Sequence, residues 1–120
     1  MPKKKPKGIV PKWTDVLNKD EVREAFKEAI VDAYGDAEQH TGLLTMIQDE
    51  VKFPFKARVL GEVLKVVGVE WPEDDEYGLD FVVERGGERH RVEARSVDLV
   101  PPLPKGHLYI AAYLEWKRNV

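Results

Sequence analysis

The hydrophobic pattern of this chain changes from a helical to a strand-like period at Phe53-Pro54-Phe55. Before this point, apolar residues recur every three or four positions, which is the period of an amphipathic helix. After it, they alternate with polar residues, which is the period of a half-buried strand. Because Pro54 favours an extended conformation at Phe53, the helices should end here. The chain is therefore predicted to be an α+β protein, with helices first and a small antiparallel sheet after them.

Two helices are expected within residues 18–52. In the first, Asn18 is positioned as an N-cap, and the apolar face consists of Val22, Ala25, Phe26, Ala29, Ile30 and Ala33. Gly35 would end this helix in the left-handed conformation. Asp36 would cap the second helix at once, with Gln39 three residues later as its capping-box partner. The second helix should run to about Val51, as one arm of a tight helical hairpin. Gly42 within it would let another backbone or ring come close.

Four or five short strands are expected within residues 53–100. The strand-like stretches are 55–60, 63–69, 79–84, 89–95 and 96–100. Gly86-Gly87 is typical of a tight hairpin turn between two of them. So many short strands in so few residues favour an SH3-like barrel. After a proline-rich connector, residues 106–118 are predicted to form a C-terminal helix, so residues 18–120 would be a single domain.

Charge divides the chain into a basic start and an acidic body. Residues 1–19 contain six lysines and one acid, a net +5, which leaves −8 for the rest of a total of −3. The Lys/Pro-rich stretch 1–17 is predicted to be a disordered tail, although Trp13, Val16 and Leu17 could dock onto the body. The acidic body should repel nucleic acid and membranes, so at most weak contacts by the tail lysines are expected with nucleic acid. The absence of cysteine and of a long apolar run favours a cytoplasmic protein.

Enzymatic chemistry is not indicated by the sequence. Nucleotide-binding glycine loops, a G-x-S-x-G turn and an H-E-x-x-H zinc motif are all absent. The only serine, Ser96, has no histidine near it in the sequence, and His40, His90 and His107 lack zinc-ligand spacing. We therefore expect a protein that is not an enzyme.

Two groups of acids are the candidate metal ligands. The first is the run Glu73-Asp74-Asp75-Glu76, and the second consists of Asp32, Asp36 and Glu38 at the predicted helix corner. Calcium takes six to eight oxygen ligands, mostly carboxylates, carbonyls and water. An EF-hand is excluded at the first group, because Tyr77 occupies a ligand position and strands flank the loop. Taken alone, the first group is more typical of a solvated loop than of a metal site, and helix capping is the more common reason for an acid at Asp36. Asp32 is the exception, since a carboxylate in the last turn of a helix opposes its dipole.

Several segments together resemble a known family. They are Ile30-Val31-Asp32-Ala33-Tyr34-Gly35 with the acids that follow, Gly42, Phe53-Pro54-Phe55-Lys56-Ala57, Val67-Gly68-Val69, the acidic loop after Pro72, Val97-Asp98-Leu99 and the helix around Trp116. In these segments the chain is similar to the cyanobacterial-type calcium-binding proteins, which lack EF-hands. The resemblance covers roughly residues 25–118. It departs from the family pattern at residues 43–47, at Tyr77 and in the thinned aromatic pattern of the last helix.

The resemblance implies a calcium-binding protein, acting as a buffer or as a sensor. It implies Ca²⁺ as the ligand, held by Glu73, Asp74, Asp75 and Glu76 of the loop and by Asp32, Asp36 and Glu38 of the corner. The alternative hypothesis is an SH3-like module that binds a protein, or binds nucleic acid with the help of Lys3, Lys4, Lys5 and Lys7.

Overall fold

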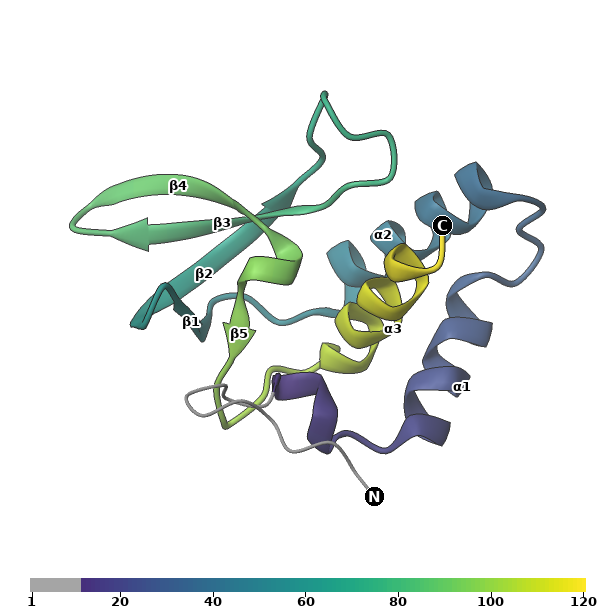
Figure 1. Ribbon diagram of the computed structural model, residues 1–120, viewed down its shortest axis with the longest axis horizontal. Helices are drawn as coiled ribbons and strands as arrows, with labels where there is room; N and C mark the ends of the chain where they lie inside the picture. Colours follow the sequence, from purple (N-terminus) through teal and green to yellow (C-terminus); the bar gives the residue numbers. More distant parts are fainter. Residues whose placement is uncertain (1–11) are drawn as a thin grey trace, which may run out of the picture.

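The switch from helices to strands is confirmed in the computed structural model, which describes residues 12–120 (Figure 1). The fold is α+β. Its elements are η1 (Trp13–Val16), α1 (Lys19–Ala29), α2 (Asp36–Glu50), β1 (Phe55–Val59), β2 (Glu62–Glu70), β3 (Asp80–Arg85), β4 (Glu88–Glu93), η2 (Ala94–Ser96), β5 (Asp98–Leu99) and α3 (His107–Arg118).

The strands form one antiparallel sheet with the order β4-β3-β2-β1-β5. Gly86 and Gly87 connect β3 to β4 with φ values of 58° and 82°, so the predicted hairpin turn is confirmed. The two edges, β4 and β5, are not hydrogen-bonded to each other within the described residues. Closure into an SH3-like barrel therefore stays a prediction, whereas the antiparallel sheet is confirmed.

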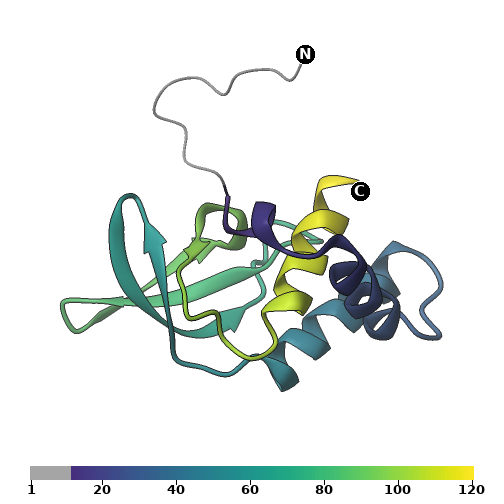
Figure 2. The same ribbon diagram turned by 90° about the horizontal axis from the view of Figure 1, so that it is seen from below.

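The core lies between the inner face of the sheet and the helices, which stand beside it in both views (Figures 1 and 2). Strand β1 alternates between buried and exposed residues, as its period of two predicts. Helix α3 packs against both α1 and α2 and is buried along Ile110, Ala111, Ala112, Tyr113 and Trp116. Because α3 lies centrally, its last turn can reach segments that are distant in sequence.

The predicted tail is wrong for residues 12–17. Residues 13–16 form a short 3₁₀ helix, and the Trp13 side chain is buried in the core. The Trp13 backbone N–H donates to Asp98 Oδ1 at 2.9 Å, which ties the segment to β5. Leu17 packs against the core as well, but Val16 is exposed. Lys3, Lys4, Lys5 and Lys7 lie outside the described residues.

Membrane insertion finds no support in the helices. Within residues 12–120, none of them combines the length and apolar character that crossing a bilayer requires. The location in the cell and the division into a tail and one domain stay predictions.

Candidate functional site

The acidic run lies in the loop of residues 71–79, between β2 and β3. This loop, called the acidic loop below, turns back on itself at Asp75. Asp75 Oδ1 accepts the backbone N–H of Tyr77 at 3.2 Å, and the Asp75 carbonyl accepts the N–H of Gly78 at 3.0 Å. A Cβ at Gly78 would come within 2.6 Å of Pro72 and 2.9 Å of Asp75 Oδ2. A larger residue here would force Pro72 or Asp75 to shift, so glycine allows the loop to fold closely on itself.

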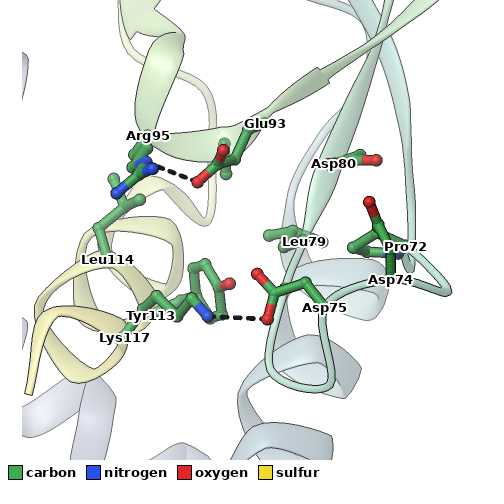
Figure 3. A pocket seen from close by; sticks show the side chains of 12 residues that line it. Pro72, Asp74, Asp75, Leu79, Asp80, Glu93, Arg95, Tyr113, Leu114 and Lys117 are labelled. Carbon is green, nitrogen blue, oxygen red and sulfur yellow. Dashed lines mark hydrogen bonds and ion pairs between the residues drawn. The ribbon is translucent and has the colours of Figure 1, made fainter. Parts of the chain in front are cut away.

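Three side chains from the helices hold the acidic loop. His40 Nε2 of α2 lies 3.0 Å from the Gly78 carbonyl oxygen, and since a carbonyl can only accept, the ring N–H donates. Tyr113 of α3 donates its hydroxyl to the Tyr77 carbonyl at 2.7 Å. Lys117, also of α3, places Nζ 3.0 Å from Asp75 Oδ1 (Figure 3). The loop is thus fixed by contacts that span about forty positions in sequence.

Aromatic rings fill the space beneath these contacts. The Trp116 ring stacks on His40 with centroids 5.7 Å apart, and it meets the edge of the Tyr77 ring at 5.6 Å. Trp116 Nε1 donates to the side-chain oxygen of Gln39 at 3.0 Å. Trp116 therefore contacts both the acidic loop and the first turns of α2.

A cavity of about 290 Å³ opens beside the acidic loop, between the ends of β3 and β4 and the last turns of α3 (Figure 3). Four carboxylates line it, from Asp74, Asp75, Asp80 and Glu93. Three of them are paired with cations: Asp75 with Lys117 at 3.0 Å, Asp80 with Arg91 at 3.3 Å, and Glu93 with Arg95 at 2.6 Å. Among the described residues, Asp74 has no cation within ion-pair distance.

The electrostatics of the loop follow from these contacts. The hydrogen bond from Lys117 is the main cause that lowers the pKa of Asp75, with burial acting against it and the Tyr77 N–H adding to it. Burial raises the pKa of the Tyr77 hydroxyl, and the charges of Glu76 and Asp36 raise it further.

The helix corner differs from its prediction. Helix α1 ends at Ala29, and residues 30–35 form a connection before α2 begins. The expected direct junction of the two helices at Gly35 and Asp36 is therefore wrong, because six residues connect them. Asp32 is outside the helix with a φ of 62°, so its carboxylate does not oppose a helix dipole. Asp is one of the few residue types that tolerate this left-handed conformation. The backbone conformation therefore explains why an aspartate occupies position 32.

The capping assignments at this corner are also corrected. Gly35 is the N-cap of α2, with a φ of 89°, and Asp36 is the first helical residue. Asp36 therefore stabilises the positive end of the helix by its charge rather than as a cap. Gln39, the expected capping-box partner, instead accepts the Trp116 indole N–H. Glu38 Oε2 accepts the N–H of Tyr34 at 3.3 Å and so steadies the connection.

The candidate ligands suit calcium by chemistry more than by arrangement. Their carboxylate oxygens are the donors that this hard cation prefers. Glu73, Asp74, Glu76, Asp32, Asp36 and Glu38 are exposed, and Asp75 is half-buried. However, no group of three or more His, Asp or Glu side chains within residues 12–120 is arranged so that it could hold a metal. Calcium binding at either place would require side chains to move.

Sequence reasoning missed the residues that hold the loop. The sequence argues only against His40 as a zinc ligand, and no motif draws attention to Lys117. Their partners in the loop are 38 and 42 positions away. Local spacing carries no signal for such pairs, so only the packing of α2 and α3 against the loop identifies them.

Comparison with known proteins relates the first part of the chain, including the helix corner, to a calcium-binding family. A family model described as "Calcium binding", of the CcbP type, matches residues 24–70. The match includes the helix corner and ends just before the acidic loop. The resemblance noted from the sequence motifs is therefore confirmed, and it supports Ca²⁺ as the expected ligand. No curated protein matches the chain.

Two solved structures share the fold. The crystal structure of Anabaena CcbP is 22% identical, with a TM-score of 0.66 over 85% of this chain and 94% of that one. A calcium-binding protein in its calcium-binding form is 18% identical, with a TM-score of 0.63 over 85% of this chain and 92% of that one. At these identities the likeness establishes the architecture, and the chain covers nearly the whole of both proteins.

Proposed function

We propose that this chain, which resembles a calcium-binding family, is a non-enzymatic protein that binds calcium at the acidic loop. The direct ligands would come from Glu73, Asp74, Asp75 and Glu76. The corner acids Asp32, Asp36 and Glu38 would add a smaller contribution through their charge. Whether the protein buffers calcium or senses it is the finer part of this proposal.

The observation that carries the proposal is the concentration of carboxylates around the cavity beside the acidic loop. Asp74 and Asp75 line this cavity together with Asp80 and Glu93. Carboxylates that lie close together repel one another, and a divalent cation relieves this repulsion. Asp74 has no cationic partner among the described residues, so its oxygens are the ones most readily offered to an ion.

The comparisons support the choice of calcium among divalent ions. The matching family is described by calcium binding, and one structure with the same fold was solved in a calcium-binding form. The family description is one of binding rather than of catalysis. The proposal that the chain is not an enzyme rests on this and on the absence of a recognisable nucleophile and base in the sequence.

A sensing role has some support in how the loop is anchored. Lys117 and Tyr113 of α3 and His40 of α2 hold the segment from Asp75 to Gly78. An ion that shifts these residues would alter contacts on two helices at once. A buffer would need no such connection, so a change in α3 upon calcium binding would favour sensing.

Isothermal titration with calcium tests the proposal. The parent chain should release or absorb heat, and Asp74→Asn plus Asp75→Asn should weaken binding at least about tenfold, since two of the direct ligands lose their charge. The matched control is Asp49→Asn plus Glu50→Gln, which removes two neighbouring exposed acids at the end of α2. The control should bind like the parent. Absence of heat in the parent would refute calcium binding.

A further inference from the structure

Lys117 is the one cation within residues 12–120 that forms an ion pair with a member of the acidic run. Its Nζ lies 3.0 Å from Asp75 Oδ1, the oxygen that also accepts the Tyr77 N–H. Figure 3 shows the two side chains turned toward each other, and both line the cavity. Both side chains are partly exposed, Lys117 by 31% and Asp75 by 41%.

We propose that Lys117 is a tethered competitor of calcium: its ammonium group occupies the Asp75 carboxylate, and calcium must displace it to bind. This inference rests on the proposed function, because it concerns the same loop. It gives a local reason for the absence of a ready-made metal cluster among the described residues. It also assigns Lys117 a role in setting the calcium affinity.

The chemistry of the two cations makes the competition direct. Lys117 Nζ is a compact point charge that donates to the same carboxylate that a calcium ion would need. The two cations repel each other at contact distance, so each weakens the hold of the other on the Asp75 carboxylate. The long lysine stem is only partly buried, so the ammonium can swing into water when the ion arrives.

The position of Lys117 on α3 connects this exchange to the helix. Lys117 lies in the last turn, where a cation is stabilised by the negative end of the helix dipole. Released from Asp75, it would keep this favourable interaction, which lowers the cost of displacement. Calcium binding would thereby release the Lys117 side chain, while Tyr113 and Trp116 still hold α3 to the acidic loop.

Calcium titration of Lys117→Gln tests the proposal, with Arg118→Gln as the matched control. Arg118 is next in sequence, in the same helical turn, and its removal changes the net charge equally. Lys117→Gln should tighten calcium binding about two- to fivefold relative to Arg118→Gln, the range of a partly exposed ion pair. Lys117→Arg, which keeps the charge, should bind no more tightly than the parent. Equal affinities for the two glutamine variants, or weaker binding by Lys117→Gln, would overturn the competition.

A measurement without calcium separates the two proposals. The pKa of the Asp75 carboxyl, followed by NMR, should be higher in Lys117→Gln than in the parent and unchanged in Arg118→Gln. If this pKa rises while the calcium affinities stay equal, the competition is refuted and calcium binding stands. If none of the variants binds calcium, the proposed function fails and the competition fails with it. An unchanged pKa would refute the ion pair itself.

Discussion

The acidic loop and the helix corner are both rich in carboxylates, but they are held in place in different ways. The loop depends on side chains from far along the chain, namely His40, Tyr113 and Lys117. The corner depends on its own backbone, through the left-handed Asp32 and Gly35 and the bond from Tyr34 to Glu38.

This difference separates two reasons for an acid to be present. At the corner, each carboxylate has a local structural reason: Asp32 by conformation, Asp36 by its place in the first turn of α2, and Glu38 by its hydrogen bond. In the loop, Glu73, Asp74 and Glu76 have no such contact to the backbone among the described residues. Acids without a structural task are the better candidates for binding an ion.

The largest expected effect comes from Trp116→Ala, because Trp116 contacts both regions. Its buried ring packs on His40 and Tyr77, and its N–H is bound by Gln39. Its loss should lower the free energy of unfolding by about 3–5 kcal/mol, measured by urea denaturation. Trp71→Ala, which removes a half-exposed ring at the start of the loop, is the control and should cost far less. Equal losses would show that Trp116 does not connect the two regions.

Gly42→Ala tests the close contact between α2 and the end of α1 next to the helix corner. A Cβ at Gly42 would collide with the backbone carbonyl oxygen of Ala29, at the end of α1. Although alanine favours helices by about 1 kcal/mol over glycine, we expect a net loss of about 1–3 kcal/mol from overpacking. Gly68→Ala, where a Cβ meets no neighbouring atom within 4 Å, is the comparison for the added methyl group. A Gly42→Ala variant more stable than the parent would mean that the two helices are not in close contact here.

Two variants of Asp32 distinguish the effect of its backbone conformation from the effect of its charge. Asp32→Ala should lower the stability by about 1 kcal/mol, because alanine disfavours a φ of 62°. Asp32→Asn keeps the conformational tolerance and removes the charge, so its stability should match that of the parent. Its calcium affinity should fall less than about twofold if the corner acts only through its charge. A loss as large as that of the loop variant, measured in the same titration, would make Asp32 a direct ligand.

The smallest effect is a pH dependence in the loop. The pKa of Asp75 is lowered from 3.8 in the folded chain, mainly by Lys117, so the charged form is stabilised by folding. This stabilisation is complete above pH 3.8 and is lost as the pH falls through the lowered pKa. Asp75→Asn should therefore be less stable than the parent at neutral pH, by at most about 1 kcal/mol for so exposed a pair. The difference should shrink as the pH falls through the lowered pKa. A difference that persists in acid would have another cause.

The sequence predicted the architecture well because the architecture depends on local patterns. The change of period at Pro54, the Gly86-Gly87 turn and the cap at Asn18 each act within a few residues, and each appears in the structure. The end of the first helix was predicted too late in the sequence. The apolar residues Ile30 and Ala33 continue the helical spacing, although α1 has already ended at Ala29. The size of Trp13 suggested that its side chain is buried. The sequence did not indicate that it lies beside β5.

Of the candidate site, only the acidic residues could be predicted from the sequence. Their composition is visible in the sequence, but their partners are not, because Asp75 and Lys117 meet through the packing of α3 against the loop. Asp80 and Glu93 came to the cavity through strand pairing, since they are direct partners in the β3–β4 register. The pairing of Asp80 with Glu93 follows from the register that the Gly86-Gly87 turn sets, whereas the meeting of Asp75 with Lys117 could not be read from spacing along the chain.

A crystal structure with bound calcium tests the central claim most directly. We predict an ion coordinated by carboxylates of the acidic loop, including Asp74 and Asp75, at about 2.3–2.6 Å from their oxygens. Lys117 Nζ should have moved away from Asp75, beyond the 3.0 Å that now separates it from Oδ1. An ion held only by Asp32, Asp36 and Glu38, with the Asp75–Lys117 pair intact, would contradict the account.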